Sequence, residues 1–420
     1  MDELRARFEN LSGKLDEALQ SNVGRLKLYR DLELLAEKLD QLHESKTMNG
    51  GLKDSQKADK SQITCDLSSQ IKELEAKLKI VPLHKGKKAN IFSKLYSMVR
   101  FANACCYIIH CGMFCVGLIS LEWAEKLLHW PKSWRLAPQL KSLISRYFLA
   151  VCGLSCTCVS YEKIWNLNQP SLIMFNHVSN MDAFAIPLTM PHQLKCVAKT
   201  DLFKVPFLGW LAIAFGAIPI NRKSRNQAIQ ALEACGRNVV KWGDFMAISP
   251  EGTRSKTGLL AKFKKGPFYL QESLQIPAIP CIIYGSYEVW PSGAFFNAMG
   301  QIHVRYLDPI YPQEGQSRED AMRVVREKML DALTEIPEGA GKPLTFRQMV
   351  DHFAAMFSMW AFVYIESILV QRWLMMHNIS FTKALAGVTL GSIPVSFVIY
   401  ILYVKFLYAQ GSLAASKQEK

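Results

Sequence analysis

The sequence lacks a G-x-S-x-G motif, the strand-to-helix turn that carries the nucleophile of an α/β-hydrolase. It also lacks a recognised nucleic-acid-binding motif, although its 50 lysines and arginines exceed its 36 acids and give a net charge of +14. Its 11 cysteines do not follow the spacing of a disulfide framework or a zinc site, so we expect reduced, buried thiols. These absences argue against a serine hydrolase, a nucleic-acid-binding protein and a disulfide-stabilised domain.

The sequence also shows no secretory signal peptide, because its first ten residues, MDELRARFEN, are polar and acidic from the second position. Positive charge is concentrated between Lys199 and Lys265, where twelve lysines and arginines face four acids. Such a surplus favours an anionic partner. Since apolar segments lie on both sides of this stretch, a phosphorylated lipid or an anionic membrane surface fits it better than nucleic acid does.

Long apolar runs predict an integral membrane protein. Three of them have about the length that a bilayer span needs: residues 101–121, 353–370 and 384–404. The last of these contains no charged residue.

These runs are expected to form two membrane hairpins. A further apolar stretch at residues 136–154 is interrupted by Arg146, so residues 101–154 are expected to form a membrane-associated helical hairpin. It either dips into one leaflet or includes one true span. Residues 353–408 are expected to form a C-terminal transmembrane hairpin.

The amino-terminal region is predicted to be helical. Residues 1–47 are interpreted as a coiled-coil helix whose heptad of leucines is regular only over about Lys27 to His43. Such a seam suits self-association, a protein partner or folding back within the chain. Residues 48–100 are expected to comprise a linker, a short amphipathic helix and a basic segment that suits an anionic, cytosol-facing leaflet.

Residues 155–341 change to a pattern of short apolar strands with helical segments between them. This alternation predicts an α/β domain with a mixed, mainly parallel sheet flanked by helices. The expected strands are SCTCVSYEKI, SLIMF, GAIPI, FMAIS, AIPCIIY and QIHVRYL.

The stretch FNHVSNMDAF places His177 and Asp182 between the buried strand SLIMF and a helical segment. A structural explanation exists, because Ser179 and Asp182 have the spacing of a capping box, with Asp182 as the third helical position. The same turn brings His177 beside the first turn of the helix. A carboxylate that holds one imidazole nitrogen leaves the other as a base for an alcohol, so capping and catalysis are compatible.

A second H-x-x-x-x-D, from His303 to Asp308, is interpreted as a coincidence of spacing. It lies in an alternating strand, where a separation of five directs the two side chains to opposite faces.

Basic motifs follow the histidine. Arg222, Lys223 and Arg225 gather after the strand GAIPI, where the simplest explanation is a solvated turn. In SPEGTRSKTG, Gly252 lets the backbone approach a ligand and Arg254 offers a guanidinium fork suited to phosphate.

Taken in order, NHVSNMD, GAIPINR, PEGTRS and IPAIP resemble the four blocks of the glycerolipid acyltransferases of the 1-acylglycerol-3-phosphate acyltransferase type, over roughly residues 140 to 310. The resemblance implies that a histidine acts as general base on the acceptor hydroxyl, that an aspartate orients it, and that no covalent acyl-enzyme forms. It implies acyl-CoA and a lysophospholipid as substrates and no bound metal or cofactor. The implied residues are His177 and Asp182 for catalysis, Arg222, Glu251, Gly252, Thr253 and Arg254 for the phosphate, and Asn176 and Lys265 in support.

The third block resembles that of lysophosphatidate acyltransferases more than those of the lysophosphatidylcholine, cardiolipin-remodelling or glycerol-3-phosphate groups. Pro219 and Asn221 depart from the bulky apolar residue and the acid that the second block often has, which bears on acceptor preference. We therefore expect a phosphatidate-forming enzyme of the endoplasmic reticulum membrane with its catalytic domain facing the cytosol. Alternatives are another acceptor, or an inactive membrane-tethered coiled-coil scaffold.

Overall fold

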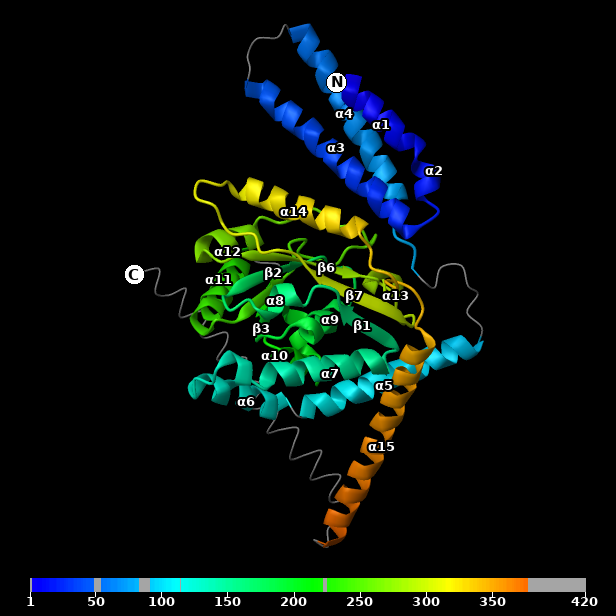
Figure 1. The fold of residues 1–420 in the computed structure, drawn as a ribbon, viewed down its shortest axis with the longest axis vertical. Coiled ribbons are helices and arrows are strands. Elements are labelled where there is room, and N and C mark those ends of the chain that lie inside the picture. The colour runs from blue at the N-terminus through cyan, green and yellow to red at the C-terminus, as the bar shows by residue number, and fades with distance from the viewer. Residues whose placement is uncertain (1, 49–53, 83–90, 114, 222–224, 377–420) are drawn as a thin grey trace.

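The computed structural model describes residues 2–48, 54–82, 91–113, 115–221 and 225–376. At its centre lies a seven-stranded sheet in the order β1-β7-β6-β2-β5-β3-β4 (Figure 1). The β6–β7 pairing is antiparallel and the other neighbouring pairs are parallel, which confirms the predicted mixed, mainly parallel α/β sheet. The strands are β1 (Leu154–Cys158), β2 (Ser171–Phe175), β3 (Leu194–Lys199), β4 (Ala217–Ile220), β5 (Phe245–Ile248), β6 (Ala278–Tyr284) and β7 (Gly300–Tyr306).

Apolar residues alternate between the two faces of the central strands, and helices cover both faces. In β2, Leu172 and Met174 join one hydrophobic cluster while Ile173 joins the other, and all three are fully buried. Burial on both faces explains why SLIMF is continuously apolar rather than alternating. One face carries α11 (Arg225–Trp242), α12 (Gly266–Leu274) and α14 (Arg318–Thr334), and the other carries α7 (Ala137–Val151), α8 (Glu162–Trp165), α9 (Asp182–Thr189) and α13 (Ser286–Val289).

Strand β3 was absent from the predicted set, because Lys195 and Lys199 interrupt its apolar pattern. The structure shows what makes Lys195 acceptable there. Its Nζ lies 2.5 Å from Glu122 Oε1, and Glu122 also bonds Lys126 and Lys141 at its two carboxylate oxygens. A buried ion pair of this kind requires a partner that no local sequence pattern reveals.

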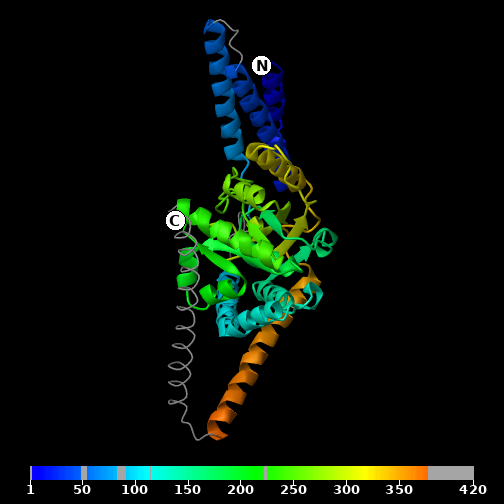
Figure 2. The same ribbon diagram turned by 90° about the vertical axis from the view of Figure 1, so that its left-hand side faces the viewer.

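The amino-terminal helices fold back on one another at one end of the molecule (Figures 1 and 2). They are α1 (Asp2–Gly13), α2 (Leu15–Ala18), α3 (Asn22–Met48) and α4 (Asp54–Lys77). Leu32, Leu35 and Leu39 of the predicted seam are at most 1% exposed, and they belong to the same hydrophobic cluster as α4, α14 and the sheet. These three leucines are therefore packed within the chain. Helix α4 begins at Asp54, inside the segment expected to be a linker.

The opposite end of the molecule carries α5 (Ile91–Met113), α6 (Cys115–Leu127) and α7 (Figure 1). The apolar run at residues 101–121 is divided between two helices, α5 and α6. Among the described residues, no single helix combines the length and apolar character of a bilayer span; Lys94–Gly112 and Cys115–Leu127, bent by 49°, meet both requirements only together.

Helix α15 (Phe346–Met376) packs its first turns on α5 and α7 and then extends away from the rest of the molecule (Figure 2). Near its start, His352 is 1% exposed, and its Nδ1 lies 2.6 Å from the carbonyl oxygen of Ala150. The predicted segment at residues 384–404 lies outside the described residues. The remaining short elements are α10 (Leu208–Ala214), η1 (Lys132–Trp134) and η2 (Thr200–Lys204).

Candidate active site

The candidate site forms where the neighbouring parallel strands β2 and β5 end. Met174 pairs with Ile248 in the sheet, so the residues that follow each strand emerge side by side at the same edge. His177 follows β2 by two residues, and Glu251 follows β5 by three. The carboxyl edge of an open parallel sheet is where ligand sites collect, and the topology here unites two motifs that are 74 residues apart.

His177 and Asp182 are in direct contact. The His177 Nδ1 lies 2.8 Å from Asp182 Oδ2, the His177 side chain is 24% exposed and that of Asp182 is fully buried. The same Oδ2 accepts hydrogen bonds from the backbone N–H groups of Val178 and Ser179, each at 2.9 Å. With three donors on one oxygen, the carboxylate is fixed in place. It holds the Nδ1 proton and leaves Nε2 available as a base.

The helix after this turn begins later than expected. Asp182 is the first residue of α9 rather than its third helical position. Half of the predicted capping box forms, since Asp182 accepts from the Ser179 N–H, but the Ser179 hydroxyl accepts from Met181 N at 3.2 Å instead of from Asp182 N. The aspartate therefore both closes the turn and orients the histidine.

The ring of His177 is also supported on the strand side. Phe175 packs its ring edge-to-face against the imidazole, with centroids 5.6 Å apart. Asn176, which is 3% exposed, exchanges two hydrogen bonds with the Ile283 backbone of β6. Through these contacts Asn176 anchors the end of β2 to the neighbouring strand β6.

Glu251 is buried and held by two backbone amides. It is 2% exposed, and its two oxygens accept hydrogen bonds from backbone amides, Oε1 from His177 N and Oε2 from Ala261 N, both at 2.8 Å. Burial raises its pKa to about 7. The carboxylate thus joins the histidine turn to the loop that follows β5.

We call residues 249–264 the EGTR loop. Its two ends are joined by Lys264 N donating to Pro250 O at 2.7 Å, and Ser255 N donates to the carbonyl oxygen of His177 at 2.7 Å. Gly252 adopts φ +71°, a left-handed conformation that residues with a side chain rarely adopt. The loop therefore lies directly against the histidine turn.

Arg254 is the cation of this loop that contacts the histidine motif. Its Nη1 donates to Asn180 Oδ1 at 2.5 Å, so the guanidinium is linked to the turn between His177 and Asp182. Thr253 beside it is exposed. Lys265 is turned to Glu319 of α14, with Nζ and Oε1 2.5 Å apart on the exposed surface. Arg222 lies outside the described residues.

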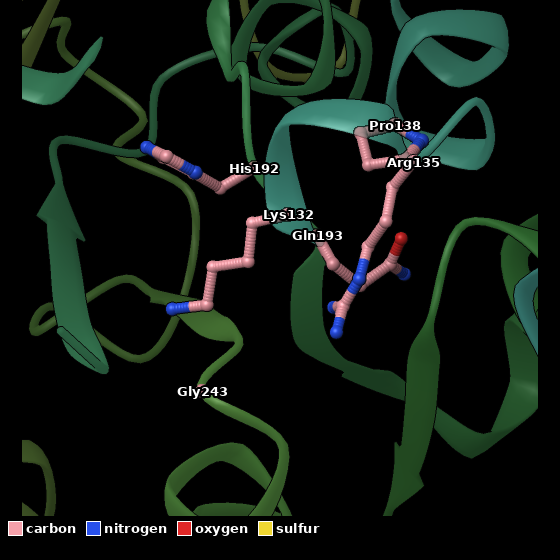
Figure 3. A pocket seen from close by; sticks show the side chains of 6 residues that line it. All are labelled: Lys132, Arg135, Pro138, His192, Gln193 and Gly243. Carbon is pink, nitrogen blue, oxygen red and sulfur yellow. The ribbon is translucent and has the colours of Figure 1, made fainter. Parts of the chain in front are cut away.

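Two other features are separate from this site. His303 Nδ1 contacts Thr157 Oγ1 at 2.9 Å and Asp308 pairs with Lys163, so the second H-x-x-x-x-D does not form a pair. A small hollow lies at the amino ends of β3 and β5, the opposite edge of the sheet (Figure 3). Its lining residues are Lys132, Arg135, Pro138, His192, Gln193 and Gly243.

The sequence motifs left out several residues that hold the site together. Asn180 and Ser255 lie inside the recognised blocks, so their proximity to the functional residues was a usable signal. Ala261, Tyr29 and Arg326 carry no such signal, because they belong to the loop end and to helices outside the blocks.

Comparison with known proteins gives one family. The acyltransferase family model matches residues 157–284. An uncharacterised acyltransferase of Schizosaccharomyces pombe is 33% identical over 202 residues, which are 45% of this chain and 71% of that protein. The 1-acyl-sn-glycerol-3-phosphate acyltransferase of Saccharomyces cerevisiae is 34% identical over 189 residues, covering 44% of this chain and 61% of the yeast protein.

Two further similarities complete the comparison. A chloroplastic 1-acyl-sn-glycerol-3-phosphate acyltransferase of Brassica napus is 31% identical over 152 residues, and the chain spans 43% of its length. The crystal structure of PlsC, the 1-acyl-sn-glycerophosphate acyltransferase of Thermotoga maritima, aligns with a TM-score of 0.49 and 21% identity, over 58% of this chain and 96% of that one.

Proposed function

Because the chain belongs to the acyltransferase family, we propose that it transfers a fatty acyl group from acyl-CoA to the sn-2 hydroxyl of lysophosphatidate, giving phosphatidate. The observation that carries this proposal is the 2.8 Å contact between His177 Nδ1 and the buried Asp182 carboxylate. It supplies an oriented imidazole base at the edge of a sheet, beside a loop that carries an arginine.

In the proposed reaction, His177 Nε2 takes the proton of the acceptor hydroxyl as its oxygen attacks the thioester carbonyl of acyl-CoA. Asp182 stabilises the imidazolium that forms. The tetrahedral intermediate then collapses, the carbon–sulfur bond breaks, and the imidazolium returns the proton to the leaving CoA thiolate. Positioned general-base catalysis of this kind contributes on the order of 10²- to 10⁴-fold to rate.

The acceptor phosphate is proposed to bind beside the EGTR loop. Arg254 is already fixed by Asn180, and a guanidinium can bond two phosphate oxygens at once. Arg222 is proposed to join it from the second block. The names of the yeast and Brassica relatives support lysophosphatidate as the acceptor. Another lysophospholipid and glycerol 3-phosphate remain the alternative acceptors.

We further propose that the protein is bound to the endoplasmic reticulum membrane, with the site facing the cytosol. Large apolar side chains are exposed at Leu127 of α6 (68%), Trp134 of η1 (68%) and Phe357 of α15 (77%). Exposed apolar side chains that gather on one surface mark an interaction site, and a membrane is the partner that we propose for these. Retention in the membrane pellet after a high-salt wash tests this proposal, and full release by salt would contradict it.

The test of the activity is an acyl-transfer assay in membranes with radiolabelled oleoyl-CoA. Lysophosphatidate, lysophosphatidylcholine and glycerol 3-phosphate are offered in parallel to the wild type and to His177→Ala. We expect labelled phosphatidate from the wild type and loss of transfer of at least a hundredfold in the variant. Undiminished transfer by His177→Ala would disprove the mechanism, whereas preference for another acceptor would disprove only the substrate assignment. His303→Ala, in the unpaired motif, is the matched control.

A further inference from the structure

The amino-terminal helices make polar contacts with the EGTR loop, close to the residues that hold His177. The hydroxyl of Tyr29 in α3 lies 2.7 Å from the carbonyl oxygen of Leu260 and 2.6 Å from Glu33 Oε1. Tyr29 is 5% exposed, so its hydroxyl is shielded from bulk water. Loss of a hydrogen bond at such a buried group costs more free energy than at an exposed one.

Arg326 of α14 completes the contact from the other side of the loop. Its Nη1 donates to the carbonyl oxygen of Ala261 at 2.7 Å, and its Nη2 donates to Leu260 O at 3.2 Å. The same Nη2 lies 2.9 Å from Glu33 Oε2 and 3.3 Å from the Tyr29 hydroxyl. One guanidinium thus joins two helices to two consecutive carbonyl groups of the loop.

The peptide between Leu260 and Ala261 is hydrogen-bonded to Glu251, the residue that holds the His177 backbone. Ala261, whose carbonyl accepts from Arg326, donates its own N–H to Glu251 Oε2. Glu251 Oε1 in turn accepts from His177 N. Tyr29 is therefore linked to the histidine by three hydrogen bonds, which are joined through the Leu260–Ala261 peptide and the Glu251 carboxylate.

A second contact fixes the middle of the loop. The N–H of Ile80, in the segment that leaves α4, donates to Thr257 O at 2.8 Å. Gly258, at φ +81°, packs so closely on Ile80 that an added Cβ would lie 2.7 Å from the Ile80 Cβ. The amino-terminal region therefore contacts the loop at two places, residues 257–258 and 260–261.

We propose that Tyr29 and Arg326 are positioning residues for the catalytic turn, through which the amino-terminal helices hold the EGTR loop where Glu251 can clamp His177. Neither residue touches the reacting atoms. They act by fixing the Leu260 and Ala261 peptides, and so the amide that Glu251 needs. The effect on rate rests on the proposed acyl transfer, whereas the effect on loop position does not.

The test uses two conservative variants of the full chain. Tyr29→Phe keeps the ring and removes the hydroxyl, and Arg326→Lys keeps a cation for Glu33 but replaces the rigid planar guanidinium with a single ammonium group. We expect kcat to fall by roughly tenfold to a hundredfold, because small displacements of a catalytic group are costly, with the KM for acyl-CoA unchanged. We also expect faster amide hydrogen exchange over residues 255–263 and at His177, but not in strand β6.

The matched control is Arg323→Ala, one turn earlier in α14. Arg323 also joins α14 to α3, with Nε 3.7 Å from Glu37 Oε1, but its other ion pair is with Asp320 rather than with the loop. We expect this variant to keep the wild-type kcat and loop exchange, because it removes a contact between the helices without releasing the loop.

The outcomes distinguish a role of Tyr29 and Arg326 in positioning the EGTR loop from a mere contact between helices. They also test this role separately from the proposed acyl transfer. Wild-type exchange or wild-type kcat in both conservative variants would overturn the proposal, as would an equal fall in kcat with Arg323→Ala. If the wild type itself transfers no acyl group, the proposed function fails, while the exchange measurement still decides whether these two residues position the loop.

Discussion

Asp182 Oδ2 lies 2.8 Å from His177 Nδ1 and at the same time accepts hydrogen bonds from Val178 N and Ser179 N. The carboxylate is therefore oriented by the backbone of the very turn that carries the histidine. Neither the imidazole nor the carboxylate can rotate independently of the other. The His177–Asp182 pair and the start of helix α9 are one structural unit.

The first prediction concerns the charge of this carboxylate. In Asp182→Asn, the neutral amide oxygen no longer balances an imidazolium, and an amide nitrogen turned toward His177 donates to Nδ1 and so favours the wrong tautomer. We expect kcat to fall on the order of 10³- to 10⁴-fold, as a wrong tautomer does in comparable pairs, with little change in KM. Steady-state acyl-transfer kinetics measure this, and Asp308→Asn, in the unpaired motif, should behave as the wild type. A loss below tenfold would show that Asp182 mainly caps the helix.

The second prediction concerns Glu251, whose pKa burial raises from 4.5 to about 7. The folded protein then holds this proton more tightly than the unfolded chain, so the stabilising contribution is complete below about pH 4.5 and is lost as the pH rises through 7. Replacing Glu251 with Gln removes the titration. We expect the free energy of unfolding of the wild type to fall by roughly 3 kcal/mol more than that of the variant between pH 4 and pH 8.

Urea unfolding at both pH values measures the effect of Glu251. Glu319→Gln is the control, because Glu319 is an exposed carboxylate paired with Lys265, and this variant should stay close to the pH dependence of the wild type. Parallel pH profiles of the wild type and Glu251→Gln would contradict a raised pKa for Glu251.

The third prediction concerns Arg254. If its guanidinium holds the acceptor phosphate, Arg254→Lys removes the two-bonded fork but keeps the charge. We expect the KM for lysophosphatidate to rise about tenfold, as loss of one charge-assisted hydrogen bond does, while the KM for acyl-CoA changes little. The control is Arg318→Ala, since Arg318 pairs with Glu272 on the exposed surface. A rise confined to the KM for acyl-CoA would assign Arg254 to the donor instead.

The fourth prediction concerns Glu122, which bonds Lys126, Lys141 and Lys195 in the buried layer between α6, α7 and β3. Burial raises the pKa of Glu122, but the three lysines outweigh burial and hold it well below its ordinary value. Glu122→Gln removes the carboxylate charge that Lys126, Lys141 and Lys195 share, and we expect a loss of about 3–5 kcal/mol in unfolding free energy. Denaturant unfolding measures it, with Glu9→Gln, in an exposed pair with Arg5, as the control. A loss below 1 kcal/mol would mean that the lysines discharge or find other partners.

The sequence predicted six of the strands and the contact between His177 and Asp182 because their signals are local. Apolar runs bounded by turn residues specify strands, and His177 with Asp182 lie within six consecutive residues. Strand β3 was not predicted, because Lys195 interrupts its apolar pattern and the carboxylate that pairs with this lysine, Glu122, is 73 residues away. A local sequence pattern does not show a charge partner at that distance.

The function of Glu251 illustrates a second limit. The motif identified the residue but not what its oxygens bind, since both partners are backbone amides supplied by other segments of the fold. The contact between Tyr29 and Arg326 is even harder to predict from the sequence, because the two residues are 297 positions apart and neither lies in a recognised block. Such contacts depend on how the helices are assembled on the sheet.

The two links between the EGTR loop and the histidine turn, Ser255 N to His177 O and Arg254 to Asn180, have a consequence for choice of acceptor. They fix the separation between the His177 imidazole, which is the proposed base, and the Arg254 guanidinium. An acceptor whose hydroxyl and phosphate are spaced differently can reach one of these two groups, but not both.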